Sequence, residues 1–564
     1  MPLTKLKLPI GSATNRLTLT QTEVDTLIRV YRSNSFTQKQ VSGYVYKSAL
    51  TRREYYLLTQ LGLNVACDTL QDDTWTFAAS TNLLQSGESA TLSVGGDLAL
   101  VDVVLAIDSV TVNSGDVSPE TAAACFTLTD DTLAFDKGSI SGEFAFTAVV
   151  SAHPVWNSSD VKTVQLMAGV KFRTVWINPA NASAALEHDG GLSLLEDYIQ
   201  RCKCYVFTAD GSKKAEIKSA TFSGNYSGMT AGTVTFADDT VVQVSTLNAA
   251  GCNFMVLRPA LHIWSGTEDG AEVLKCTGAY DLLPTGKKTF PKKYIGMFKA
   301  FNQSGVLKSQ PNRIPTGTQT IATFQSQALA GNPNNVAAAN GYGLWNYSDW
   351  CKENALHLAW FANTNYEVNV GTGRIGGDQT QYNRVRNIVT GFTLPYAGKY
   401  QCAAAPSPDS AGNYVNSLNF FGIEGMGEQI WEFVIGFRHD GAGTAYVWDD
   451  NEWSETHAAD HTIPLRVNSA TQAYIKTIIA GEHFDMMPRA VNASATTGMC
   501  DGHWISNIGR LLVVGCYARH GSFCGLSASA AADAFSDSNA YIGARLAFYG
   551  EPEDVSGSAF VAVL

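Results

Sequence analysis

The sequence predicts a β-rich α+β protein with several domains, and three observations support this fold class. The chain has 564 residues, more than a single hydrophobic core ordinarily organises. Charged residues make up only 16% and there are 50 glycines, a balance that favours β-rich extracellular or structural proteins. Short apolar runs separated by Gly, Asn, Asp and Ser recur from residue 66 onward, which is the pattern of strands and turns.

Residues 1–65 are predicted to form a small helical N-terminal head. Thr20 and Glu23 fit a capping box, and a second helix is expected at residues 51–61. Charges of both signs lie on the remaining faces, so these read as ordinary amphipathic helices. A helical head in front of β modules suits attachment to a larger particle.

Two β-rich modules are predicted next, at residues 66–155 and 156–285. The first has strand-like runs about 8–12 residues apart, which suggests a small immunoglobulin-like sandwich. The second is similar but contains one helix near residues 192–201. We expect both to act as β-sandwich-like spacers. A polar, Pro-containing join then leads into one larger domain, residues 286–564, with a long helix at 348–362.

Charge and hydropathy exclude two classes of partner. The formal net charge is −12, and the densest basic cluster is the two lysine pairs at 287–288 and 292–293, so nucleic acid is not expected to bind. No run approaches the ~18 apolar residues of a membrane span, so membrane insertion is not expected. The N-terminus lacks the unbroken apolar stretch of a signal peptide, and virion assembly would offer another route to a surface function.

The chain has eleven cysteines, an odd number spread over its whole length. Cys202 and Cys204 form the only close pair, and no second pair or histidine cluster completes a zinc site. Buried free thiols are therefore favoured over a disulfide framework.

The C-terminal stretch has an unusual organisation. Residues 511–514 and 542–548 are short apolar runs that predict buried strands. The residues between them follow neither a period of 2 nor one of 3.6. Chemically mixed, aperiodic sequence held between two buried strands is typical of a binding surface on a rigid frame.

Several motifs of the last domain resemble a known family. Residues 419–434 read Asn-Phe-Phe-Gly-Ile-Glu-Gly-Met-Gly-Glu-Gln-Ile-Trp-Glu-Phe-Val, and 543–548 read Gly-Ala-Arg-Leu-Ala-Phe. Both are similar to signatures of the C-type-lectin fold in its formylglycine-generating-enzyme-like branch. Residues 294–298 and 309–313, with the helix that ends at 363–365, resemble phage tail-fibre proteins diversified by a retroelement. The resemblance covers roughly residues 290–550, about half the chain.

A further observation agrees with retroelement diversification of a variable segment at 510–548. Adenine mutagenesis of Asn-type codons cannot produce Lys, Glu, Gln, Met or Trp, and none of these five types occurs between Gly515 and Tyr541.

The resemblance implies a phage receptor-binding protein of the tail-fibre or tail-tip type, located in the virion tail. It would adhere to a bacterial surface receptor, protein or glycan, form a homotrimer and contact other virion tail proteins through its N-terminal region. A bacterial cell-surface adhesin with the same domain remains an alternative. The predicted ligand-binding residues combine rigid rings, charged donors and adaptable polar groups. They are Tyr517, Arg519, His520, Phe523, Ser527, Ser529, Asp533, Phe535, Asp537, Asn539 and Tyr541.

An enzyme of this fold is the competing class. The oxidase branch binds copper through two thiols, and Cys524 falls on the second position while Arg519 falls on the first. Cys516 lies eight residues before Cys524, too far upstream for that site, and one thiol cannot provide the coordination that Cu(I) prefers. His457 and His461 suggest a hydrolase, but no Gly-x-Ser-x-Gly or His-Glu-x-x-His motif is present. We therefore predict no catalytic residues and no cofactor.

The acidic loop at residues 448–453 is compatible with structural calcium. Asp449, Asp450 and Asn451 offer oxygen ligands at close spacing. The Glu-Pro-Asn and Trp-Asn-Asp motifs of calcium-dependent sugar-binding lectins are missing, so sugar binding through calcium is not expected.

Overall fold

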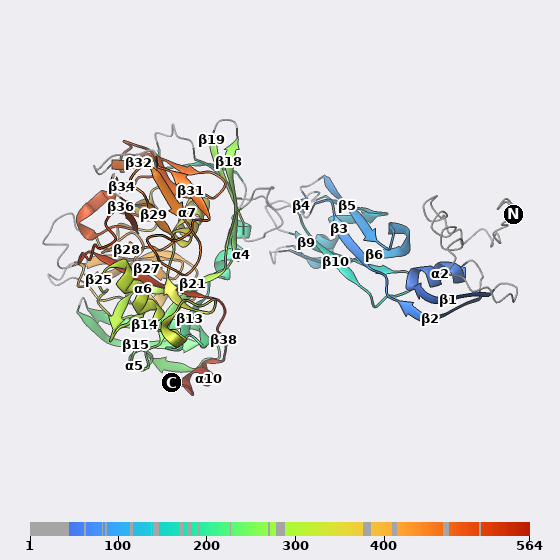
Figure 1. The fold of residues 1–564 in the computed structure, drawn as a ribbon, viewed down its shortest axis with the longest axis horizontal. Coiled ribbons are helices and arrows are strands. Elements are labelled where there is room, and N and C mark those ends of the chain that lie inside the picture. Colours follow the sequence, from blue (N-terminus) through green and yellow to red (C-terminus); the bar gives the residue numbers. More distant parts are fainter. Residues whose placement is uncertain are drawn as a thin grey trace. The chain divides into compact units, whose positions relative to one another are not determined.

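The chain forms two compact units, Met1–Val170 and Lys171–Leu564, each with its own sheets and core (Figure 1). The computed structural model describes residues 44–60, 64–81, 83–84, 87–112, 117–136, 138, 146–168, 173–177, 183–189, 192–225, 227–268, 271–277, 288–375, 385–408, 414–465, 473–506 and 509–564.

Two four-stranded sheets form most of the first unit and share one core, to which Leu92, Phe135, Phe146 and Leu166 contribute. The first sheet has the order β3 (Trp75–Ala79), β5 (Glu88–Gly96), β8 (Thr132–Phe135) and β7 (Phe126–Thr129). The second has the order β4 (Leu83–Leu84), β10 (Lys162–Ala168), β9 (Phe146–Pro154) and β6 (Val103–Val112). The β-rich character predicted for residues 66–155 is confirmed. The unit extends further, because β10 pairs with β9 and supplies Leu166 to the core.

The described chain begins with two parallel strands joined by a helix. β1 (Tyr44–Thr51) pairs with β2 (Asn64–Gln71), and α2 (Arg52–Gln60) connects them. The helix predicted at 51–61 is therefore confirmed. A wholly helical head is wrong for β1, whose tyrosines and β-branched residues favour extended backbone. The helix predicted to start near Thr20 lies outside the described residues.

In the second unit, fifteen of the described strands belong to one sheet. Its path is β16 (Val241–Gln243), β15 (Gly228–Phe236), β14 (Lys213–Asn225), β13 (Cys204–Phe207), β17 (Asn253–Arg258), β21 (Lys293–Lys299), β37 (Ile542–Tyr549), β28 (Trp431–Phe433), β35 (Leu511–Val514), β36 (Ser529–Asp533), β34 (Gly502–Ile505), β32 (Ala473–Ala480) and β33 (Asp485–Val491). Off this path, β24 (Gly341–Leu344) pairs with β37, and β38 (Glu553–Asp554) pairs with β14.

The domain boundary expected at 285–286 does not separate compact units. β17 and β21 come from opposite sides of it and pair antiparallel, with Met255 opposite Gly296. β17 is buried along nearly its whole length, so its backbone groups need partners on both edges, and β13 and β21 provide them. The predicted module 156–285 is divided between the two units instead.

α7 (Tyr347–Phe361) contacts a five-stranded sheet of the second unit. The order of this sheet is β12 (Glu187–Asp189), β11 (Arg173–Ile177), β19 (Ala271–Thr277), β18 (Leu261–Glu268) and β20 (Lys288–Phe290). A capping box starts the helix: the Asn346 side chain accepts from the Asp349 amide, and the Asp349 carboxylate accepts from the Asn346 amide. The helix predicted at 348–362 is confirmed. Among the described residues, no helix is both long enough and apolar enough to cross a membrane.

Smaller elements complete the fold. Three small sheets have the orders β22 (Phe301–Gln303) with β23 (Val306–Lys308), β25 (Cys402–Pro408) with β26 (Tyr414–Phe420) and β27 (Ile423–Glu424), and β29 (Phe437–His439) with β30 (Thr444–Val447) and β31 (His461–Pro464). The short helices are α3 (Pro119–Ala124), α4 (Ser193–Gln200), α5 (Val244–Ala249), α6 (Ile321–Leu329), α8 (Tyr366–Asn369) and α10 (Gly557–Val561), with 3-10 turns η1 (Leu100–Asp102), η3 (Pro333–Asn335), η4 (Leu394–Tyr396) and η5 (Ala518–Phe523). α4 confirms the helix predicted near residues 192–201.

Buried charges join the central strands of the large sheet. Glu432 on β28 accepts hydrogen bonds from Lys299 on β21 and from both Nε and Nη2 of Arg545 on β37. All three side chains are at most 2% exposed. Since removing one partner of such a network leaves an uncompensated buried charge, it holds β21, β28 and β37 in one arrangement.

Candidate functional site

The C-terminal stretch, residues 511–548, begins and ends in strands at the centre of the large sheet. β28 lies between β35 and β37, antiparallel to the first and parallel to the second. β35 is buried at every position, and β37 at every position except its last. The two strands predicted at 511–514 and 542–548 are therefore confirmed, and they fix both ends of the intervening segment in the core.

The first part of this segment is a short closed loop. A disulfide joins Cys516 to Cys524, whose Cα atoms are 5.1 Å apart, and η5 lies between them. Gly515 and Gly525 flank the pair with φ angles of +89° and +154°, which favour glycine and let the chain turn at both ends. The expectation of free thiols is wrong for these two cysteines, because this turn brings them together.

Six rings form a continuous series over the loop, which we call the aromatic row: Tyr474, Phe523, Trp504, His520, Tyr517 and Tyr541. The ring centroids of Trp504 and His520 are 4.5 Å apart, and those of Tyr517 and Tyr541 are 4.8 Å apart. Every ring in the row is half-buried. Mutual contacts therefore hold the rings rigid while part of each remains open to solvent.

His520 occupies the middle of the aromatic row as a neutral ring. Burial, with a smaller effect of the neighbouring Arg519 charge, lowers its pKa to about 4. Its Nδ1 is buried and has no hydrogen-bond partner among the described residues. At neutral pH it therefore packs as an aromatic side chain, while Arg519 is exposed and carries the positive charge of the loop.

Two members of the row lie outside the segment singled out in the sequence. Trp504 is on β34 and Tyr474 is on β32. The Tyr474 hydroxyl lies 2.8 Å from the Ser522 hydroxyl. In β34, Trp504 is the half-buried position between buried His503 and Ile505, a distinction that becomes visible only in the structure. No sequence signal distinguishes Tyr474 from the other half-buried tyrosines.

Two predicted contact residues are scaffold instead. Ser527 is 3% exposed, and its amide and hydroxyl both donate to Asp501 Oδ2, at 2.8 and 2.6 Å. Ser529 is fully buried on β36, and its hydroxyl lies 2.8 Å from Nδ1 of His503. These serines satisfy buried polar groups below the surface, so neither side chain can touch a receptor.

Of the other predicted residues, Asp533 ends β36 and the rest follow that strand. Asp533, Phe535, Asp537 and Asn539 are all partly exposed. Burial, with the nearby charge of Asp537, raises the pKa of Asp533 to about 6. Phe535 contacts Trp453 with ring centroids 5.8 Å apart. These residues form a second, more acidic patch.

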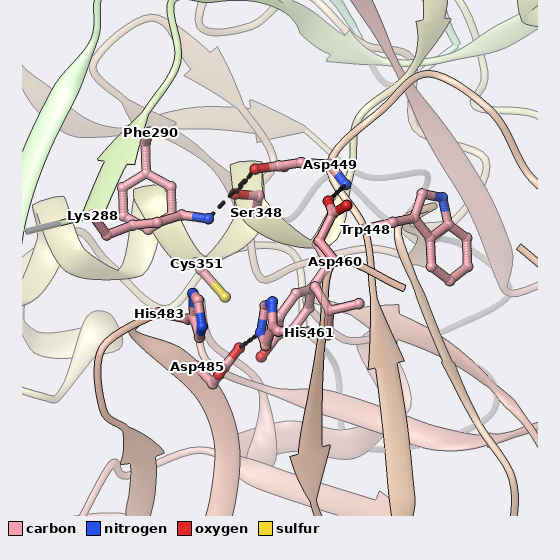
Figure 2. Close-up of a pocket in the computed structure, with 12 residues that line it drawn as sticks. Lys288, Phe290, Ser348, Cys351, Trp448, Asp449, Asp460, His461, His483 and Asp485 are labelled. Carbon is pink, nitrogen blue, oxygen red and sulfur yellow. Dashed lines mark hydrogen bonds and ion pairs between the residues drawn. The ribbon is translucent and has the colours of Figure 1, made fainter. Parts of the chain in front are cut away.

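A separate polar cavity of about 90 Å³ lies in the second unit (Figure 2). At one end Lys288 and Ser348 both donate to Asp449. At the other, His461 Nε2 lies 3.2 Å from Asp485, and its ring stacks on His483 at 3.9 Å. The cavity is lined by Lys288, Phe290, Tyr347, Ser348, Cys351, Val447, Trp448, Asp449, Asp460, His461, His483 and Asp485.

The cavity contains a thiol, a histidine and a carboxylate, the three kinds of group that nucleophilic catalysis uses, so it is the place to examine the enzyme alternative. Cys351 is buried, and burial together with the Asp485 charge raises its pKa. A thiol held in its neutral form is a poor nucleophile. Cys351 is therefore not an activated nucleophile in this cavity. Of the two histidines that suggested a hydrolase, His461 lines this cavity, whereas His457 stacks on Trp448.

The three calcium-candidate side chains each bind a different partner in the fold. Asp449 accepts from Lys288 and Ser348, and Asp450 lies 3.0 Å from His457. The Asn451 amide donates to the Tyr342 carbonyl inside the fold. No three His, Cys, Asp or Glu side chains are grouped to hold a metal ion in the part of the chain that the structure describes.

Comparison of the chain with protein-family models and with curated proteins gives no match. The geometry of the aromatic row and its frame therefore carries the functional proposal.

Proposed function

We propose that this protein is a phage receptor-binding protein, of the tail-fibre or tail-tip type, that adheres to a bacterial surface receptor. The aromatic row is its contact face, and Arg519 and the Asp533–Asn539 patch add polar contacts. The observation that carries the proposal is the row itself: six half-buried rings in mutual contact, built over an aperiodic segment whose two ends lie in buried strands.

The physical argument is that rigid rings bind at low entropic cost. A Tyr or Trp side chain already held by its neighbours loses little freedom on binding and offers a large contact area. Such residues dominate the binding energy of protein interfaces. Receptor recognition through a replaceable segment also needs a frame that does not change with it, and β35 and β37 are buried strands of the central sheet.

The C-type-lectin fold, the virion location and the homotrimer belong to the same proposal. Its support is the family-like sequence at 419–434, in which Glu432 lies in the buried core and bonds Arg545 of the closing strand. Several copies on one fibre would turn weak single contacts into stable attachment. A bacterial surface adhesin would use the same face, and immunogold labelling of phage particles and of cells distinguishes the two locations.

The test compares binding of the purified full chain and its variants to intact cells of a bacterial panel. Tyr517→Ala and Arg519→Ala should each lower affinity about tenfold or more. Tyr446→Ala is the matched control, because Tyr446 is also half-buried and packs on Arg438 with 4.1 Å between the guanidinium and the ring centre, outside the row.

Unchanged affinity of a folded Tyr517→Ala variant for cells that the parent binds would overturn the proposed contact face. The enzyme alternative has its own readout. Release of soluble sugar or peptide from cells by the parent, lost in His461→Ala, would favour a hydrolase at the polar cavity.

A further inference from the structure

The Cys516–Cys524 disulfide encloses the central part of the aromatic row. Tyr517, His520 and Phe523 all lie within the loop that it closes. The loop has little regular structure of its own, since Gly521 breaks the 3-10 turn with a φ angle of +55°. A covalent closure restricts such a loop strongly, because it removes most of the open conformations available to the chain.

The loop also depends on contacts that require its closed form. The Ala518 amide donates to the Gln429 carbonyl at 3.2 Å, and the Cys524 amide donates to the Gly521 carbonyl at 3.0 Å. Phe523 packs so closely on β34 that a Cβ at Gly502 would lie 2.6 Å from its ring. We expect opening of the Cys516–Cys524 ring to loosen Phe523 and His520 against Trp504, which would remove the middle of the row.

The other nine cysteines have a different character. They are Cys67, Cys125, Cys202, Cys204, Cys252, Cys276, Cys351, Cys402 and Cys500, and all are free thiols. Burial raises the pKa of eight of them, all but Cys67, which keeps them protonated and unreactive. The rest of the fold therefore needs no oxidation and is compatible with a reducing compartment. The Cys516–Cys524 pair is the one disulfide among the described residues, so reduction breaks a covalent bond in the binding loop and leaves the other nine cysteines as they are.

We propose that this disulfide is a redox latch on the binding face: the face is competent when the disulfide is formed and is switched off by reduction. The proposal rests on the proposed function, whose site it regulates. In the reducing step a small dithiol transfers two electrons and two protons, so that the Cys516–Cys524 bond breaks, two protein thiols form and the dithiol becomes its own disulfide. Oxidised glutathione, or another small disulfide, reverses the step outside the cell.

Access to the sulfur atoms sets the rate of the reducing step. Cys516 is 0% and Cys524 is 1% exposed, so a reductant must wait for the loop to open. A bound receptor would hold the loop closed. Receptor binding should therefore slow reduction, and by linkage it should also make the reduced state less favourable at equilibrium, since reduction weakens binding.

The test uses the full chain, oxidised or treated with dithiothreitol, with thiols counted by alkylation and mass spectrometry. The oxidised chain should have nine thiols and the reduced chain eleven. Reduction should raise amide hydrogen exchange at 517–524 about tenfold or more and leave β35 unchanged. Cell binding should fall about tenfold or more. The double variant Cys516→Ser/Cys524→Ser should bind cells and exchange amide hydrogens as the reduced chain does, and dithiothreitol should change neither property. Cys67→Ser should behave as the parent does.

Equal exchange at 517–524 in both redox states, or parent-like binding by the double variant, would overturn the latch. Eleven free thiols in chain handled without reductant would do the same. The two failures are distinguishable. If the loop loosens on reduction but the oxidised chain binds no cells, the proposed function is overturned while the redox response of the loop stands.

Discussion

Replacing Ser527 by alanine separates scaffold from contact face within the C-terminal segment. Asp501 is 2% exposed, and the Ser527 amide and hydroxyl are both donors to its carboxyl group. Gly525 passes directly over the same group, where a Cβ would lie 2.2 Å from Oδ1. Neighbouring backbone therefore fills the space around this carboxyl, and we expect Ser527→Ala to leave the hydroxyl's hydrogen bond unreplaced.

The magnitude depends on the charge of Asp501. Burial raises its pKa well above the ordinary value, and the Ser527 donors lower it. A hydrogen bond to a neutral group contributes about 0.5–1.5 kcal/mol and one to a charged group about 1.5–3 kcal/mol. Since the folded-state pKa is raised, Asp501 stabilises the fold below its unfolded pKa and loses that contribution as pH rises through the folded value. Ser527→Ala raises this pKa further, so its cost should grow with pH.

The measurement is denaturant unfolding followed by tryptophan fluorescence at pH 4 and pH 8. We expect a loss of about 1 kcal/mol while the Asp501 carboxyl is neutral, and a larger loss, up to about 2–3 kcal/mol, as rising pH ionises it. Ser522→Ala is the matched control, because Ser522 is exposed in the same segment, and its effect should stay within about 0.5 kcal/mol. If Ser527→Ala destabilises no more than Ser522→Ala at pH 8, the assignment of Ser527 to the scaffold is wrong.

Three further predictions test other parts of the fold. Asp533→Asn should flatten the pH dependence of the free energy of unfolding. The raised pKa of about 6 makes the parent lose roughly 1–2 kcal/mol of stability between pH 4 and pH 6, after allowance for partial exposure. An equal slope in the variant would refute this. Glu432→Gln leaves two buried cations without their carboxylate and should lower the free energy of unfolding by about 3–5 kcal/mol, against little change for exposed Glu452→Gln. Gly525→Ala should destabilise the fold more than Gly521→Ala. Both add backbone strain of about 1–3 kcal/mol, but only Gly525→Ala also places a Cβ against the Asp501 carboxyl. Equal unfolding midpoints would contradict this.

The sequence was informative wherever one period dominated. The strand at β35 and the helix α7 were predicted within a residue, because four consecutive aliphatic residues, or apolar residues that repeat at helical spacing, leave few alternatives. Strand pairing could not be predicted in the same way. Nothing local in β17 indicates that its neighbour β21 lies beyond a polar join, and the domain boundary was misplaced for this reason.

The candidate site shows the same division. Polar and aromatic residues between two strands predicted which segment carries the proposed binding face, but composition does not tell an exposed serine from a buried one. Ser529 is buried because β36 lies beside β34, where its hydroxyl meets the buried His503 ring, and this pairing joins residues distant in the sequence. Trp504 and Tyr474 were missed because their contribution arises only when β32 and β34 lie next to that segment.

The position of β28 between β35 and β37 has a consequence for protein engineering. The two ends of the 515–541 segment lie two strand spacings apart, or about 10 Å, and this span is set by the sheet rather than by the segment. Because β36 lies inside this segment and pairs with both β34 and β35, a graft must keep that strand and can replace only the loops before and after it. Each doubling of such a loop's length adds only about 0.6 kcal/mol of closure entropy. This site is therefore a natural acceptor for transplanted loops, so the second unit could serve as a scaffold for engineered binders.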